Sequence, residues 1–294
     1  MKVAPFALKS CLLLAALAAA PGARALVGGA GADQNTAASP WAGVGSLSTG
    51  GGQFTGTLIA PGYLLTAAHV VNGVDPASIS FRLNSENSFA SGASQVFINP
   101  AYGGTPTHGD LAIVKLSGAV KPGAAPIYDV FGGSVQGREL ALVSHANSTS
   151  IRKTGANMAD MVLTDPGGKP QTYLFDFDGP TLDSNRIGDN IVANGTLGAA
   201  REASLVAGDS GSAAFVQAFV NGQWRWQLAG INTFEVTFRE GPTTSGAFGT
   251  GGGGIVLSSY ASWINAVISP TPEPGSYLML LLGLGLVGSV ARRR

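Results

Sequence analysis

The sequence predicts an all-β protein, and three observations support this prediction. The 294-residue chain contains 43 glycines and 12% charged residues, a composition typical of many strands joined by tight turns. Its apolar residues fall in short runs that are rich in valine, isoleucine and threonine, which favour strands. About 240 residues lie between two hydrophobic ends, a length that suits one two-lobed β domain.

The first 25 residues have the pattern of a secretory signal peptide. Lys2 and Lys9 supply the positive start, residues 11–20 the apolar core, and residues 23–25 (Ala-Arg-Ala) the cleavage site. A buried N-terminal helix is the alternative. Cys11 is the single cysteine of the chain, so removal of this peptide would leave an exported protein without disulfides.

The opposite end has a second targeting pattern. Residues 269–275 form a proline-rich linker, residues 276–291 are almost entirely apolar, and Arg292–Arg294 close the chain. The apolar run is shorter than the ~20 residues that span a bilayer comfortably. The 276–294 segment with its linker resembles the PEP-CTERM sorting signal of Gram-negative bacteria. This resemblance implies processing by an exosortase-like enzyme; a plain C-terminal membrane anchor is the alternative.

The body between these ends is mildly acidic. Six of the 17 lysines and arginines and one of the 17 acidic residues lie in the two ends, which leaves 11 basic against 16 acidic residues and a net charge of about −5. Because the body has no basic cluster, we expect no nucleic-acid partner. Contact with a membrane is expected only through the C-terminal segment.

The expected strands of the body follow one another at short intervals. In the first half they cover residues 41–47, 54–59, 63–65, 79–83 and 95–98, with Gly50–Gly52 at a hairpin turn. In the second half residues 224–233 are an expected strand, and the glycine run 251–254 an expected flexible loop. Residues 258–268 are expected to close the body as a helix, because Tyr260, Trp263, Ile264 and Val267 share one face.

Three motifs carry chemistry, in the order histidine, aspartate, serine. Residues 208–212 (Gly-Asp-Ser-Gly-Ser) hold Ser210 between glycines, which permit a sharp turn and a close approach to a substrate. A serine nucleophile needs a base and hydrogen-bond donors for the oxyanion, and the N–H groups of Gly208 and Ser210 are suited to that second role. His69 ends an apolar run, and Asp110 opens another. An ordinary glycine-rich turn is the alternative for the serine loop.

These motifs resemble the conserved boxes of the trypsin/chymotrypsin family: Thr-Ala-Ala-His at 66–69, Asp-Leu-Ala-Ile at 110–113 and Gly-Asp-Ser-Gly at 208–211. The resemblance covers residues 26–268. It implies two six-stranded antiparallel barrels of chymotrypsin type with a C-terminal helix. It also implies a triad whose roles are defined in this very family: Ser210 attacks, His69 transfers the proton, and Asp110 orients His69.

The implied activity is that of a serine endopeptidase with a protein or peptide substrate and no cofactor. The protein would be exported across the inner membrane of a Gram-negative bacterium by way of signal peptidase. Its destination would be the cell surface, the outer envelope or the medium. An esterase that uses the same triad, and a catalytically silent binding or surface-matrix protein, are the alternatives.

The resemblance also assigns the substrate-binding residues. Ser204, six residues before Ser210, corresponds to the base of the specificity pocket, where an uncharged residue implies uncharged, apolar substrate side chains. Thr233, Phe234 and Glu235 correspond to the segment that pairs with the substrate backbone. Glu235 departs from the family's glycine, so it is expected to narrow the pocket or to favour a basic substrate.

The start of the body resembles the N-terminus of activated family members. Cleavage after Ala25 would leave Leu26-Val27-Gly28-Gly29 first, with a free amine that pairs with Asp209. A buried carboxylate is costly without a partner, so the pair with the new amine would order the oxyanion loop. Removal of the signal peptide during export would then activate the enzyme. A glycine-rich leader with no such role is the alternative.

No metal site is expected. His108 and His145 lie in expected loops or strand edges, without the cysteine or histidine spacing of a zinc site. Asp176, Asp178 and Asp183 are acidic enough to suggest calcium. Phenylalanines alternate with the first two, however, a pattern that suits a strand better.

Overall fold

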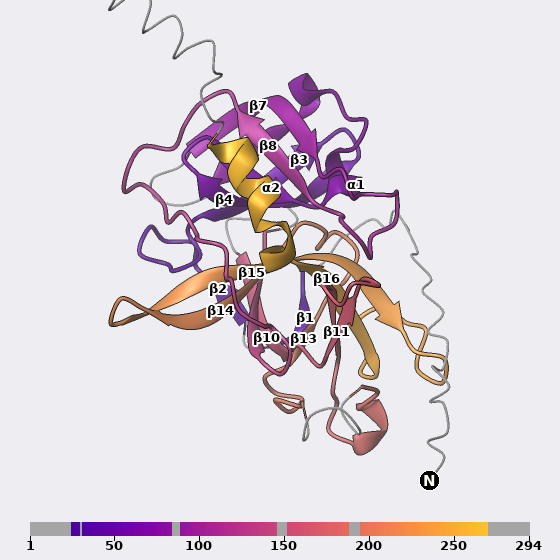
Figure 1. Ribbon diagram of the computed structural model, residues 1–294. Helices are drawn as coiled ribbons and strands as arrows, with labels where there is room; N and C mark the ends of the chain where they lie inside the picture. The colour runs from indigo at the N-terminus through magenta and orange to yellow at the C-terminus, as the bar shows by residue number, and fades with distance from the viewer. Residues whose placement is uncertain (1–24, 30, 84–88, 146–151, 188–194, 270–294) are drawn as a thin grey trace, which may run out of the picture.

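The computed structural model describes residues 25–29, 31–83, 89–145, 152–187 and 195–269, which form two β lobes and a C-terminal helix (Figure 1). The proposed signal peptide, apart from Ala25, and the C-terminal sorting segment lie outside the described residues. In the described parts of the chain, no helix has both the length and the apolar character needed to cross a bilayer.

The first lobe is a closed six-stranded antiparallel barrel. Its strands are β3 (Val44–Thr49), β4 (Gly52–Ala60), β5 (Tyr63–Thr66), β6 (Ser80–Leu83), β7 (Phe89–Ile98) and β8 (Ala112–Leu116), joined in the order β3-β4-β5-β8-β7-β6. The short helix α1 (Ala68–Val71) follows β5, and a 3₁₀ turn, Pro76–Ser78, precedes β6. All five strands expected in this half are present; four lie within three residues of their predicted bounds, whereas β7 begins six residues before its predicted start.

The second lobe is built on an eight-stranded sheet. Its strands are β2 (Gly31–Asp33), β9 (Glu139–Ser144), β10 (Arg152–Met158), β11 (Met161–Thr164), β12 (Pro170–Asp176), β14 (Ala213–Val220), β15 (Gln223–Thr237) and β16 (Thr250–Val256). The order is β11-β12-β16-β15-β14-β9-β10-β2, and β1 (Val27–Gly28) and β13 (Ala203–Ser204) form a separate two-stranded sheet that packs against β10 and β16.

Six of these strands, from β12 through β16 to β10, form the second barrel. The two ends of this curled sheet, β10 and β12, meet where Nδ2 of the Asn157 side chain donates to the Asp176 carbonyl at 2.7 Å. Next to it the Asp160 N–H donates to the Leu174 carbonyl at 3.0 Å. These two bonds bring the ends of the curled sheet together without a strand ladder between β10 and β12 in the described residues, while β11 and β2 extend the sheet beyond them.

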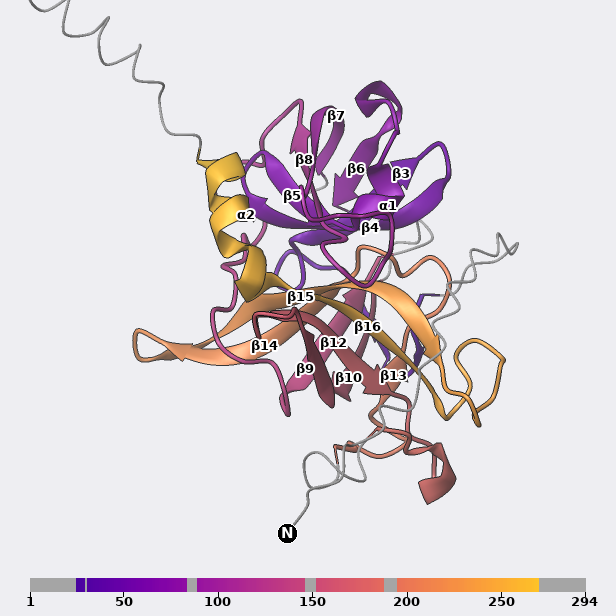
Figure 2. The same ribbon diagram turned by 45° about the vertical axis from the view of Figure 1, so that its right-hand side comes forward.

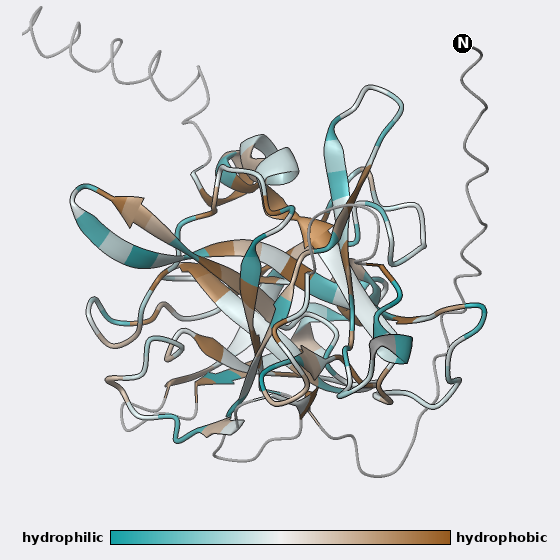
Figure 3. Cartoon of the chain, turned by 90° about the horizontal axis from the view of Figure 1, so that it is seen from below, coloured by the Kyte–Doolittle hydropathy of each residue, from teal (hydrophilic) through white to brown (hydrophobic). Residues whose placement is uncertain are grey.

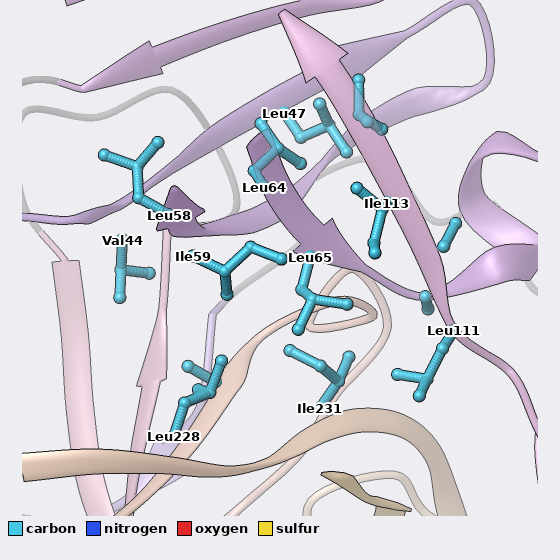
Figure 4. Close-up of a cluster of buried hydrophobic side chains, with 14 of the residues drawn as sticks. Val44, Leu47, Leu58, Ile59, Leu64, Leu65, Leu111, Ile113, Leu228 and Ile231 are labelled. Carbon is cyan, nitrogen blue, oxygen red and sulfur yellow. The ribbon is translucent and has the colours of Figure 1, made fainter. Parts of the chain in front are cut away.

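One hydrophobic core joins the two lobes. Figure 4 shows side chains of the first barrel, among them Leu58, Leu65 and Leu111, gathered with Leu228 and Ile231 from β15. All of these residues are buried. The shared core holds the lobes in one relative position, which a site assembled from both lobes requires.

The glycine run 251–254 is a buried strand and not the expected flexible loop. It makes up most of β16, between β12 and β15. A Cβ atom at Gly252 would lie 2.8 Å from both Leu205 and Phe175. The glycines therefore let neighbouring elements approach the backbone of β16 closely.

The C-terminal helix lies against the outside of both lobes (Figure 2). A 3₁₀ turn, Leu257–Tyr260, leads into α2 (Ala261–Ile268), so the expected helix is regular only over its second part. Tyr260 and Ile264 are buried in the shared core, and Trp263 and Val267 pack against it. The predicted apolar face is therefore the one that the helix buries.

The β14–β15 hairpin extends out of the body and is banded with hydrophobic and hydrophilic residues (Figures 1 and 3). It turns at Asn221 and Gly222, both with positive φ, as a two-residue type I′ connection requires. Phe219 and Trp224 lie opposite one another near the tip, and each is more than 60% exposed.

Candidate active site

His69, Asp110 and Ser210 come from three elements that meet between the lobes. His69 is the second residue of α1, and Asp110 lies just before β8, both in the first lobe. Ser210 lies in the loop between β13 and β14 of the second lobe. Residues 41 and 141 positions apart in the chain are thus brought into direct contact with His69.

The three side chains form a continuous chain of hydrogen bonds. Asp110 is fully buried, and its Oδ2 lies 2.6 Å from His69 Nδ1, whereas its Oδ1 accepts the His69 backbone N–H at 2.8 Å. Because an ionised carboxylate only accepts hydrogen bonds, Nδ1 carries the imidazole proton. His69 Nε2 is then free to accept from the Ser210 hydroxyl, 2.9 Å away. This is the polarity that general-base activation of a serine needs.

The backbone around Ser210 depends on two glycines with positive φ, Gly208 at 100° and Gly211 at 82°. The amide of Asp209 donates to Val206 and that of Gly211 to Asn232, at 3.0 and 2.9 Å. Among the described residues, no backbone acceptor is found for the amides of Gly208 and Ser210. These are the two donors expected to hold an oxyanion, and both residues are accessible to solvent.

The side chain of Asp209, the residue before Ser210, is buried and accepts a hydrogen bond from the backbone nitrogen of Leu26. Its carboxylate lies 3.0 and 3.3 Å from the Leu26 nitrogen and accepts the Val206 N–H at 2.8 Å. Burial raises the pKa of Asp209 to about 7, against the opposing effect of the Ser144 hydroxyl. Leu26 still follows Ala25 here, so its nitrogen is an uncharged amide.

Several residues that the sequence did not single out support the serine loop. Asn232 Nδ2 donates to Ser212 Oγ at 2.8 Å, and the Tyr173 hydroxyl donates to Asn232 Oδ1 at 2.6 Å; all three side chains are buried. The signal for Asn232 was its amide side chain inside a strand of apolar residues. No local pattern linked Tyr173 to it, because the two are 59 residues apart.

The residues expected to form the specificity pocket belong to β13 and β15 of the second lobe, which also carries Ser210. Ser204 is fully buried in β13, and its hydroxyl has no partner in the described part of the chain. The Thr233 hydroxyl donates to the Pro106 carbonyl at 2.7 Å, so that side chain is occupied within the protein. Phe234 is buried opposite Gly253, and the carboxylate of Glu235 accepts a hydrogen bond from Ser245.

The two remaining histidines lie outside this arrangement. His108 is exposed in a loop, as expected. His145 directly follows β9 but is fully buried, where Asn35 Nδ2 lies 3.3 Å from its Nε2. Burial lowers the pKa of His145 to about 4. It is therefore a neutral residue of the interior.

The aspartates that suggested calcium differ in their exposure to solvent and in their hydrogen-bond partners. Asp176 is buried at the end of β12 and accepts the N–H groups of Arg186 and Ile187, whereas Asp183 is exposed. Glu202 accepts the Asp178 N–H at 2.6 Å. Within the described ranges, no three histidine, cysteine, aspartate or glutamate residues are grouped as a metal site would require.

Three buried carboxylates of the second lobe, those of Asp160, Asp176 and Glu202, accept hydrogen bonds from backbone N–H groups. Burial raises the pKa of Asp160 to about 8, that of Asp176 to about 6 and that of Glu202 to about 7. The negative charge of Asp176 adds to the rise at Asp160. Asp176 and Glu202 accept N–H groups of the irregular segment after β12, which satisfies those amides. Asp160 accepts the N–H of Asp176, at the end of β12 itself.

Comparison with known proteins identifies two sequence families. The family model for trypsin matches residues 27–264, and that for the PEP-CTERM protein-sorting motif matches residues 270–294. None of the curated proteins with which the chain was compared matches it.

A crystal structure of a scabies mite inactivated protease paralogue is similar to the chain. The two are 17% identical, with a TM-score of 0.51 over 79% of this chain and 95% of the mite protein. At this identity the likeness concerns the fold alone, and it confirms the predicted chymotrypsin-type architecture.

Proposed function

This chain belongs to the trypsin family and carries a PEP-CTERM sorting signal, and on that premise we propose that it is a surface-sorted serine endopeptidase. The sorting signal implies export and delivery to the surface or envelope of a Gram-negative bacterium. The observation that supports hydrolysis is the hydrogen-bonded chain from Asp110 through His69 to Ser210, with bonds of 2.6 and 2.9 Å.

In the proposed reaction, Ser210 Oγ attacks the carbonyl carbon of a peptide bond while His69 Nε2 takes the hydroxyl proton. Asp110 stabilises the imidazolium that forms, and the amides of Gly208 and Ser210 donate to the oxyanion. When the tetrahedral intermediate collapses, the proton passes from His69 to the leaving amine. Water then repeats the sequence on the acyl-enzyme and releases the acid.

Activation would follow from removal of residues 1–25. Leu26 has a φ of 26° with Ala25 attached, a conformation that costs a non-glycine residue roughly 1–3 kcal/mol. Cleavage would remove that constraint and turn the amide into an ammonium group against the Asp209 carboxylate. The new ion pair would lower the pKa of Asp209 and hold the serine loop.

A fluorophosphonate probe tests the proposal because it reacts only with an activated serine. We expect labelling of the purified protein beginning at Leu26, and none after Ser210→Ala. His69→Ala should also abolish labelling, whereas His108→Ala, which removes an exposed histidine outside the site, should not. Absence of labelling in a folded protein that begins at Leu26 would refute the proposed hydrolysis.

Two further comparisons separate the alternatives. Matched amide and ester substrates distinguish an endopeptidase from an esterase. A chain that retains Ala25 should label more slowly than one that begins at Leu26, and equal rates would contradict activation by cleavage. The mite protein is described as an inactivated protease paralogue, so the fold alone does not imply hydrolysis; support comes from the triad residues that this chain retains.

A further inference from the structure

The β14–β15 hairpin ends in two aromatic side chains that the body does not cover. Phe219 and Trp224 are 63% and 68% exposed, and their ring centroids lie 5.5 Å apart in an edge-to-face arrangement. Further from the tip, Trp226 packs against the shared core and Ala218 against the core of the second lobe. The tip therefore carries an apolar pair beyond the part of the hairpin that packs on the body, and exposed apolar groups of this kind mark interaction sites.

The hairpin carries no negative charge, although the body has a net charge of about −5. Residues 210–234 contain no aspartate or glutamate, and Arg225, next to Trp224, is their single charged residue. In the described part of the chain the exposed Arg225 forms no ion pair, and its guanidinium donates to the Gln223 side chain at 3.3 Å. Two aromatic rings and an unneutralised cation at one tip are complementary to a surface that is negatively charged outside and apolar beneath.

A lipid bilayer with anionic headgroups is such a surface. Tryptophan and phenylalanine side chains are favourable at the boundary between headgroups and acyl chains. An arginine there keeps its charge among the phosphates while its aliphatic stem lies along apolar groups, and an anionic leaflet attracts it. Within the described sheet, β14 pairs with β9 over Ala213–Phe215 only, so the outer hairpin has unpaired backbone groups. Because these groups need water, the tip can enter the hydrated headgroup layer but cannot cross the bilayer.

The hairpin lies on the side of the molecule where the described chain ends. Figures 1 and 2 both show the hairpin tip and the end of α2 on the left. α2 ends at Ile268, and the sorting signal with its apolar residues 276–291 follows in the sequence. A bilayer that binds this apolar segment therefore lies on the side that the hairpin faces. In both views α1, which carries His69, lies toward the right, so the candidate active site faces away from that bilayer.

We propose that the hairpin tip, formed by Phe219, Trp224 and Arg225, is a docking site for the surface of an anionic lipid bilayer. The two rings enter the headgroup layer, and the guanidinium binds lipid phosphate. This contact adds a second point of attachment to the C-terminal one expected from the sequence. Two points of attachment fix the orientation of the body, with the candidate active site open to substrates in solution. The inference goes beyond the proposed function and holds whether or not the protein hydrolyses anything.

The test uses a dye whose emission rises in apolar surroundings, such as nitrobenzoxadiazole. The chain from Leu26 onward lacks cysteine, so one dye can be attached at Gln223→Cys, at the hairpin tip. Thr243→Cys is the matched control, exposed beyond the opposite end of β15. Both proteins keep the C-terminal segment and carry Ser210→Ala, so that no proteolysis intervenes. With vesicles of phosphatidylcholine and phosphatidylglycerol, we expect a several-fold gain in emission at Gln223→Cys and none at Thr243→Cys.

Further substitutions assign the gain in emission to the three proposed side chains. Phe219→Ser combined with Trp224→Ser should abolish it, whereas Phe248→Ser, which removes another exposed ring, should not. Arg225→Gln should lower the equilibrium constant for insertion of the tip into phosphatidylglycerol vesicles about 5-fold. No gain at the tip, an equal gain at Thr243→Cys, or a gain that survives the double substitution would overturn the inference. A gain without vesicles that grows with protein concentration would assign the tip to a second copy of the chain and overturn it as well.

Discussion

The substitution Gly211→Ala tests whether the serine loop is held as the structure describes. Gly211 has a φ of 82°, in the left-handed region that costs alanine roughly 1–2 kcal/mol. A Cβ atom there would also lie within 3.0 Å of Thr66 Oγ1 and the Thr55 carbonyl. Both belong to strands of the first barrel, so neither can move freely away from the new methyl group.

Gly222 offers a matched control for the conformational part of this cost. Its φ of 81° is nearly the same, but a Cβ atom there would meet nothing within 4 Å. Gly222→Ala should therefore lower the free energy of unfolding by roughly 1–2 kcal/mol. Gly211→Ala adds overpacking, worth roughly 1–3 kcal/mol more, for a total of about 2–5 kcal/mol.

The assay combines thermal unfolding with active-serine labelling. For a body of this size each kcal/mol lowers Tm by about 2–4 °C, so Gly211→Ala should unfold well below Gly222→Ala. The alanine methyl group also pushes Ser210 away from the first barrel, which carries His69, so labelling by the fluorophosphonate should fall in this variant alone. Equal losses of Tm in the two variants, with labelling preserved in both, would refute the reasoning.

Three further predictions follow from the same contacts. Asp110→Asn should leave the fold intact but lower kcat by about 10⁴, the value known for this change in the family, because the new amide donates to His69 Nδ1 and forces the wrong tautomer; a normal kcat would contradict the proposed role. Tyr173→Phe should cost about 1–3 kcal/mol in urea unfolding, since Asn232 Oδ1 loses its donor, whereas an unchanged midpoint would mean that the bond is not needed. The third concerns pH: the pKa values of Asp160, Asp176 and Glu202 are raised to about 8, 6 and 7, so the folded state binds more protons than the unfolded state. The contribution of these three groups to the free energy of unfolding should be greatest below about pH 4, and it should decline as pH rises through their folded pKa values. In Asp160→Asn the decline of Tm between pH 6 and about pH 8 should be smaller, and an identical decline would contradict this assignment.

Much of the architecture could be predicted from the sequence. Short strands, tight turns and the amphipathic pattern of residues 258–268 depend on neighbouring residues, so they can be recognised locally. The glycine run 251–254 was misjudged for the same reason. Glycine favours turns in isolation, and only the packing of Leu205, Phe175 and Tyr173 against it makes a buried strand favourable.

The candidate site divides in the same way. Ser210, His69 and Asp110 could be named because each lies in a short motif with its own chemical logic. His145 illustrates the limit, since nothing beside it in the sequence indicates that it is fully buried. The acidic residues that suggested calcium were also ambiguous, because the backbone amides that donate to Asp176 come from Arg186 and Ile187, 10 and 11 positions away.

The sequence by itself determined the chemical groups of this protein, their order and the sorting signal at residues 270–294, because those properties are local. Only the tertiary structure decided which groups meet. It brings the Leu26 nitrogen to Asp209, 183 positions away, and Tyr173 to Asn232, 59 positions away. Such contacts arise from strand pairing and core packing across the whole chain, and the short-range patterns of a sequence carry no record of them.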